Sequence, residues 1–94
     1  MITYRAMYKF LDDGVHAEVL DFPGAISSSP DLDEARRLLR SALTDMAETA
    51  LQHGEALPPP NPSATDPEAD LEEPIYLLLN AATRVLEVSQ DARP

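Results

Sequence analysis

The N-terminal part of the chain alternates apolar and polar side chains in two runs. The apolar positions are Ile2, Tyr4, Ala6, Tyr8 and Phe10 in the first run and Val15, Ala17 and Val19 in the second. A period of two is typical of a strand with one buried face. Between the runs, Asp12-Asp13-Gly14 provides residues that favour a tight turn. The pattern therefore predicts an antiparallel hairpin.

A corner-like motif follows the second run and consists of Asp21, Phe22, Pro23 and Gly24. Proline cannot donate to a sheet ladder and disfavours helix at the preceding residue, whereas glycine takes a positive φ at little cost. We therefore expect these four residues to form a structural corner. Beyond it, residues 25–28 can run back as a short third strand.

A long helix is predicted over residues 32–53. Asp31 fits the N-cap, and Glu34 three residues later completes the sequence pattern of a capping box. Asp33 is spaced to pair with Arg37, and Gly54 marks the end of the helix. Apolar residues recur at helical spacing, namely Leu32, Ala35, Leu39, Ala42, Leu43, Met46, Ala50 and Leu51.

The chain changes character after the helix. Residues 55–74 contain six prolines and six acidic residues, which is typical of an extended, solvated connection or a disordered loop. A run of five apolar residues then predicts a buried strand, formed by Ile75, Tyr76, Leu77, Leu78 and Leu79. Residues 83–88 are apolar and β-branched, and their pattern fits either a strand or a helical turn.

These elements predict an α+β domain: a three-stranded antiparallel sheet, one long helix packed on one face, and a further C-terminal strand. Its parts are a β-β-β-α core over residues 1–54, a Pro-rich acidic linker over residues 55–74, and a strand with a tail over residues 75–94. A length of 94 residues with 44% apolar content suits one domain with a genuine core.

Charge narrows the classes of function. Seventeen acidic against seven basic residues give a net charge of −10, which disfavours binding of nucleic acid or anionic membranes. The charge favours a basic partner, or it serves solubility alone. The chain has no cysteine, Arg5 and Lys9 interrupt any signal-peptide pattern, and no apolar run approaches the ~20 residues of a membrane span. We expect a cytoplasmic protein.

Few residues offer candidate chemistry. The candidates are His16 with Glu18, His53, the serines Ser27, Ser28 and Ser29, the pair Asp12 and Asp13, and the arginines Arg36, Arg37 and Arg40. Two ligands do not make a zinc site, and neither a nucleophile elbow nor a glycine-rich phosphate loop occurs. These residues have ordinary structural explanations. They occupy polar strand positions, turns, the C-terminus of the helix, where a cation is favourable, and a solvated helix face. We therefore predict a non-enzymatic protein without catalytic, metal or cofactor residues.

The order of the motifs resembles the HicB antitoxin family. The matching stretches are the corner Asp21-Phe22-Pro23-Gly24, the helix start Asp31-Leu32-Asp33-Glu34-Ala35, and the exit residues Gly54, Leu57, Pro58 and Pro60. The resemblance covers roughly residues 4–62 and implies a partial ribonuclease-H-like fold. It also implies a small basic HicA-like toxin as partner, an mRNA-cleaving protein that the chain would bind and neutralise in a type II toxin–antitoxin system.

The resemblance leaves two alternatives. One is a stand-alone oligomeric HicB-like protein without a toxin partner. The other is a metal-dependent nuclease, which the predicted first strand disfavours because it carries no carboxylate where ribonuclease-H-type enzymes hold metal ions. About thirty residues follow the exit motif, too few for the separate DNA-binding domain that many family members carry, so we expect no direct nucleic-acid binding.

Self-association is the last expectation from the sequence. Five consecutive apolar residues indicate a strand that needs cover on both faces, and one helix covers only one face of a sheet. Residues 75–79 are therefore the candidate oligomer contact, made through the second face of the strand or through its open edge. Leu77 and Leu79 lie on one face and Tyr76 and Leu78 on the other, and one of these pairs should lie at the contact. A homodimer or homotetramer is the expected assembly.

Overall fold

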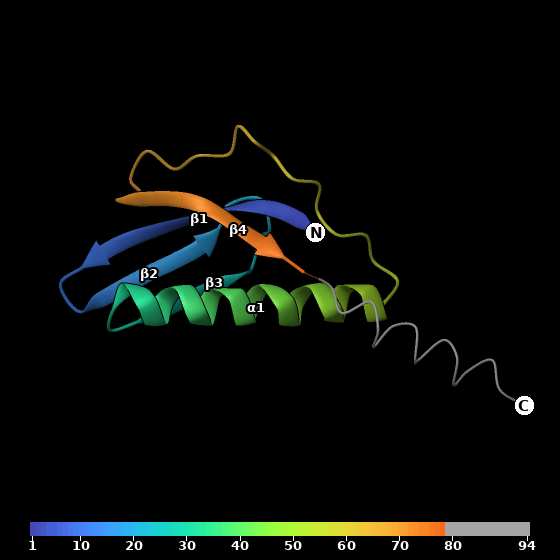
Figure 1. The fold of residues 1–94 in the computed structure, drawn as a ribbon, viewed down its shortest axis with the longest axis horizontal. Helices are drawn as coiled ribbons and strands as arrows, with labels where there is room; N and C mark the ends of the chain where they lie inside the picture. Colours follow the sequence, from blue (N-terminus) through green and yellow to red (C-terminus); the bar gives the residue numbers. More distant parts are fainter. Residues whose placement is uncertain (79–94) are drawn as a thin grey trace, which may run out of the picture.

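The structure, a computed structural model, describes residues 1–78 of the 94-residue chain. The elements in chain order are β1 (Ile2–Leu11), β2 (Gly14–Val19), β3 (Ile26–Ser29), α1 (Leu32–Gln52) and β4 (Leu71–Leu77). The strands form one antiparallel sheet in the order β3-β2-β1-β4, with α1 along one side of it (Figure 1). The predicted α+β class is confirmed.

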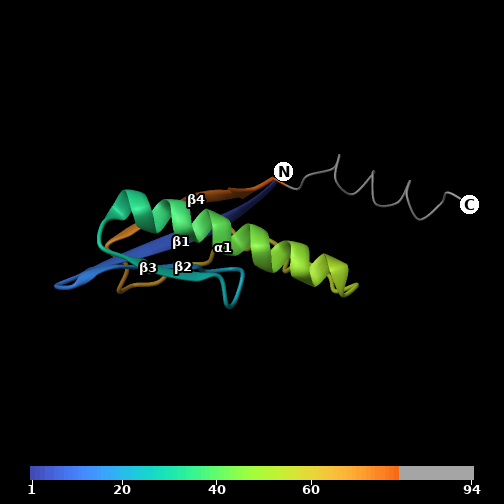
Figure 2. The same cartoon turned by 90° about the horizontal axis from the view of Figure 1, so that it is seen from below.

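The period of two in β1 divides the molecule into layers. Tyr4, Ala6 and Tyr8 are buried in the main core, together with Val15, Ala17 and Val19 of β2 and with Ile75 and Leu77 of β4. Figure 2, seen from the side of α1, shows the helix lying across these strands. The face of the sheet turned away from α1 is called the outer face below. It carries the intervening residues of β1, Arg5, Met7 and Lys9.

The helix packs through a narrow row of small and branched side chains. Ala35, Leu39, Leu43 and Ala47 are fully buried, at the i, i+4 spacing that faces one side of a helix. Each buried leucine of this kind contributes about 1.5–3 kcal/mol to folding. The helix ends at Gln52, with His53 as C-cap, one residue earlier than the sequence predicts.

The segment between α1 and β4 is called the strap, residues 55–70. It runs along the side of the sheet opposite α1 (Figure 1). The strap is irregular in backbone, but it is not simply solvated, because Leu57 packs against the core and Met7 on the outer face is completely buried. Most residues of the strap are exposed, as expected for an extended, solvated connection, but the strap is also held on the sheet by specific hydrogen bonds of Tyr4 and Asp21.

Two predicted strand boundaries need correction. The third strand is shifted by one residue to Ile26–Ser29, because Ala25 still belongs to the turn and donates its N–H to the Phe22 carbonyl at 3.2 Å. The last strand begins at Leu71, four residues before the predicted start, and its N-terminal half pairs with β1 from Tyr8 to Arg5. The predicted strand residue Leu79 and residues 83–88 lie outside the described part of the chain.

We predict that Gly24→Val destabilises the fold by on the order of 1–3 kcal/mol, whereas Ser28→Ala leaves it nearly unchanged. Gly24 has φ +93°, and a Cβ there would lie 2.8 Å from Cε of Met46. Ser28 is an exposed residue of β3. Urea unfolding of both variants measures the difference, and equal midpoints would contradict the corner geometry.

Candidate protein-binding surface

The predicted corner holds the strap on the sheet through the Asp21 carboxylate. Its Oδ1 accepts the backbone N–H of Arg5 and its Oδ2 accepts the backbone N–H of Asn61, both at 2.9 Å. One side chain therefore joins the end of β2, the start of β1 and the strap. Charge-assisted bonds of this kind are about twice as strong as neutral ones, so a carboxylate suits this position better than an amide.

An aromatic pair supports the same junction from inside the core. The rings of Tyr4 and Phe22 meet edge to face, with centroids 5.5 Å apart, and both side chains are buried. The Tyr4 hydroxyl donates to the Pro58 carbonyl at 2.7 Å, which places the Pro-rich exit of α1 against the sheet. Burial, and then the nearby Asp21 carboxylate, raise the pKa of Tyr4. In contrast, Pro23 and Gly24 are exposed and turn the chain.

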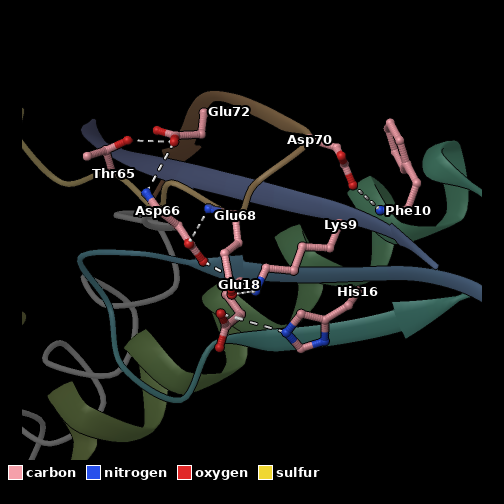
Figure 3. A network of polar contacts seen from close by, with 9 residues as sticks. All are labelled: Lys9, Phe10, His16, Glu18, Thr65, Asp66, Glu68, Asp70 and Glu72. Carbon is pink, nitrogen blue, oxygen red and sulfur yellow. Dashed lines mark hydrogen bonds and ion pairs between the residues drawn. The ribbon is translucent and has the colours of Figure 1, made fainter.

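The strap places acidic side chains over the outer face (Figure 3). Lys9 of β1 binds two of them, with Nζ 3.6 Å from Asp66 Oδ2 and 3.2 Å from Glu68 Oε2. Glu72 of β4 accepts Thr65 Oγ1 at 2.7 Å and also binds Nε of Arg5 at 3.0 Å. The hydrogen bond from Thr65 has the largest effect, followed by that from Arg5, and together they hold the pKa of Glu72 below its usual value. The group is therefore a carboxylate at neutral pH.

Negative charge exceeds positive charge on this face. We define the acidic outer surface by the carboxylates of Glu18, Asp66, Glu68, Asp70 and Glu72. The basic side chains among them are Arg5, Lys9 and His16, whose Nε2 lies 3.7 Å from Glu18 Oε2. The Glu68 side chain is 80% exposed and Asp70 is also exposed, so these two are the carboxylates most available to a partner.

Apolar side chains lie beside this charge at the end of β1. Phe10 and Leu11 are 51% and 55% exposed, and the Phe10 N–H donates to Asp70 Oδ2 at 2.7 Å. Protein interfaces commonly combine a few aromatic or aliphatic anchors with a polar rim. By the alternation of β1, Leu11 shares the outer face with Lys9, whereas Phe10 lies on the side of α1 with Tyr8. The acidic outer surface together with Leu11 therefore has the composition of a protein-binding surface for a basic partner.

The residues considered for catalysis take structural positions. Ser27 Oγ donates to the Ala35 carbonyl and Ser29 Oγ donates to the Asp31 carbonyl, so both hydroxyls tie β3 to the start of α1. His53 Nδ1 lies 3.8 Å from Glu55 Oε1 at the exposed end of the helix. Within residues 1–78, no group of three or more His, Cys, Asp or Glu side chains is arranged to hold a metal ion.

The helix cap differs in part from the prediction. Asp31 is the N-cap, and its Oδ1 accepts the Glu34 N–H at 2.9 Å. The Glu34 side chain binds the Arg37 guanidinium instead of completing a capping box. Asp33 lies 3.7 Å from Arg36 instead of pairing with Arg37 as predicted.

Arg36 forms a partly exposed ion pair with β4 that the sequence did not reveal. Its Nε and Nη2 bind the two oxygens of Glu73 in β4, at 2.8 and 3.0 Å, and its guanidinium carbon lies 5.9 Å from the ring centroid of Tyr8. Burial, followed by the charge of Glu73, raises the pKa of Tyr8 to about 12. Arg36 holds the pKa of Glu73 below its usual value. The alternation along β4 would have placed Glu73 toward the helix, had its start at Leu71 been recognised.

The residues of the candidate oligomer contact divide between the two faces of β4. Ile75 and Leu77 are 4% and 1% exposed because they fill the chain's own core, which leaves the pair Tyr76 and Leu78 as the candidates for contact with a second copy. Tyr76 and Leu78, at 55% and 74%, remain exposed on the other side. Leu79 lies outside the described residues.

Comparison with known proteins identifies the fold. No family model matches the chain, and no curated protein matches its sequence. Among solved structures, the chain is similar to the N-terminal domain of the Burkholderia pseudomallei antitoxin HicB, with a TM-score of 0.66 and 20% sequence identity. The similarity covers 83% of this chain and 100% of that domain. The chain therefore has the fold of a HicB N-terminal domain.

We predict that Asp21→Ala lowers the free energy of unfolding by on the order of 1–3 kcal/mol, because it leaves two backbone N–H groups without their acceptor. The strap should also exchange its amide hydrogens faster around Asn61. Asp45→Ala removes an equal charge from the exposed side of α1 and serves as the control. Unchanged amide exchange in the strap of the Asp21 variant would contradict the role of Asp21 in holding the strap on the sheet.

We predict that stability falls on acidification below about pH 4.5, partly through Glu73. The pKa of Glu73 in the folded chain lies below the ordinary value of 4.5, so its ion pair stabilises the fold above that pH. This contribution is lost as the pH falls through the folded pKa. Thermal melts from pH 7 to pH 3 should show a shallower decline for Glu73→Gln than for the natural chain. Parallel curves would exclude a role for this pair.

Proposed function

We propose that the chain is a HicB-like antitoxin that binds and neutralises a small basic HicA-like mRNA-cleaving toxin. The observation that carries this proposal is the similarity in fold to the N-terminal domain of an antitoxin, which the chain covers over its full length. The motif order of the sequence supports the same assignment independently, since the corner and the Pro-rich exit have defined structural roles at Asp21 and Pro58.

The acidic outer surface is the proposed binding site for the toxin. Its carboxylates are held in place by Lys9, Arg5 and Thr65, so a partner meets charges that are already ordered. Binding then loses little side-chain freedom at these positions. A surface of one sign also steers a basic protein toward it, with an effect that weakens as salt is added.

The same surface explains how binding would neutralise an RNA-cleaving protein. A basic nuclease holds RNA through lysine and arginine contacts with phosphates. Carboxylates that occupy those side chains exclude RNA by competition, and this requires no chemistry from the antitoxin. The helix-facing residues of β1, Tyr4, Ala6 and Tyr8, are buried and carry no carboxylate, which supports a non-catalytic role.

The proposal includes a cytoplasmic location, because an mRNA-cleaving partner acts where mRNA is translated. In the part of the chain that the structure describes, no helix has the length and apolar character to span a membrane. The proposal excludes direct nucleic-acid binding by this chain, given its net charge of −10. It also includes a homodimer or homotetramer, the usual way for a small domain to cover an open strand edge.

We predict that neutralising two exposed carboxylates slows association with the toxin. The probe is any short basic protein encoded next to the gene of this chain, and its association rate is followed by surface plasmon resonance. Glu68→Gln with Asp70→Asn should lower that rate by about 2- to 10-fold at low salt, because steering charge is lost while the hydrogen-bond acceptors remain. Raising the salt should shrink the difference.

Asp45→Asn with Glu48→Gln is the matched control, since it removes the same charge from exposed positions on α1. This pair should slow association less than the outer-surface pair. Equal effects of the two pairs would mean that only net charge matters, and the outer surface would not be the binding site. If no basic neighbour binds at all, the stand-alone alternative replaces the antitoxin assignment.

A further inference from the structure

Within residues 1–78, no strand pairs with the outer edge of β4. β4 is the terminal strand of the sheet and pairs with β1 alone among the described strands. An unpaired strand edge offers backbone N–H and C=O groups to another strand. The direction of these groups in β4 decides which of them another strand could bind.

The backbone hydrogen bonds of Arg5 in β1 show which groups of the neighbouring strand β4 point outward. Its N–H donates to Asp21 Oδ1 and its carbonyl accepts the N–H of Leu20, so both groups point away from β4. Pro74 lies opposite Arg5 and occupies a position without hydrogen bonds to β1. The backbone of Pro74 therefore faces the open edge, where its missing N–H costs the sheet nothing. By the alternation of a strand, Tyr76 also directs its N–H and C=O outward.

The C-terminal half of this edge is apolar. Tyr76 is 55% exposed, Leu78 is 74% exposed, and Met1 is 83% exposed. Ile2 pairs with Leu77, so Met1 lies beside Leu78 at the same end of the sheet. We define the edge patch by Met1, Tyr76 and Leu78. Large exposed side chains gathered beside free backbone groups are typical of a contact with another chain.

The edge patch also lacks the charge that dominates the rest of the surface. Residues Ile75–Leu78 and Met1–Tyr4 contain no acidic or basic side chain, although the chain carries a net charge of −10. The nearest carboxylate on the outer side of β4 is Glu72, about 13 Å from Tyr76 at about 3.3 Å per residue. A basic partner gains nothing from charge at this patch, whereas a second copy of the acidic chain meets no repulsion there.

We propose that β4 pairs antiparallel with β4 of a second copy, with the two-fold axis at Tyr76. In this register the two Tyr76 residues exchange both backbone hydrogen bonds, and the Pro74 carbonyl accepts the N–H of Leu78 of the second copy. The two Glu72 side chains lie about 26 Å apart, well beyond the Debye length of about 8 Å at physiological salt. Pro74 has no N–H to donate, so the pairing ends there.

This inference specifies the contact of the proposed homo-oligomer and does not rest on toxin binding. Of the two contacts expected from the sequence, through the second face of the strand or through its open edge, the geometry of β4 favours the edge. The resulting sheet would be continuous across both subunits, with α1 of each copy on the same side. A monomer that still binds the toxin would overturn the dimer and leave the antitoxin proposal intact.

The test uses the full-length chain and light scattering coupled to gel filtration at about 10–100 μM. We expect a mass of twice the 10.3 kDa of one chain, or a multiple of that dimer. Tyr76→Asp should raise the dimer dissociation constant about tenfold or more, because it brings two like charges together at the axis. Tyr76→Pro should do the same by removing the outward N–H together with the exposed ring, with circular dichroism confirming that each subunit remains folded.

Ile26→Asp is the matched control on the opposite edge strand, where Ile26 is 48% exposed. This variant should stay dimeric. A natural chain that is monomeric across the concentration range overturns the proposal, including the case in which residues 79–94 cover the edge. Dissociation by Ile26→Asp with an intact Tyr76→Asp dimer would place the contact at β3 and overturn it as well.

Discussion

The central strand β1 is the constraint on which the rest of the structure depends. It is paired on both sides, with β2 through Leu11 to Ala6 and with β4 through Ile2 to Tyr8. The alternation of its side chains also determines which residues lie on each face of the sheet: Tyr4 and Tyr8 face α1, while Met7 faces the strap and is equally buried. A one-residue slip of this strand would exchange the two sets and bury Arg5 and Lys9 against the helix. The register is therefore fixed by both layers at once.

The sequence predicts the elements whose signals are local. The alternation through β1 and β2 and the i, i+4 spacing of Leu39 and Leu43 suffice for the hairpin and the helix. The start of β4 could not be predicted in this way, because Glu73 and Pro74 are poor strand formers on their own. They are accommodated by long-range partners: Arg36 binds Glu73, and Pro74 faces an edge where no N–H is needed.

The sequence predicts that the surface is acidic, but it does not predict where on the fold the carboxylates gather. Composition indicates a basic partner, yet the carboxylates of Glu18, Asp66 and Glu72 come from a strand, the strap and another strand. They gather only because the strap folds back over β1, and that depends on Asp21 and Tyr4, neither of which belongs to the surface. Asp21 was correctly placed in a corner, but nothing local indicated that its carboxylate binds Asn61, forty residues further along.

The two ends of β4 have opposite character, and this separates the two proposed contacts. At its start, Glu72 is part of the acidic outer surface, while its end carries the uncharged Tyr76. Pairing two antiparallel copies through Tyr76 sets the two-fold axis perpendicular to the sheet, so both outer faces lie on the same side of the joined sheet. The acidic surfaces then point outward at opposite ends and stay open to partners. Dimerisation would thus double the charge that attracts a basic protein without covering the site that binds it.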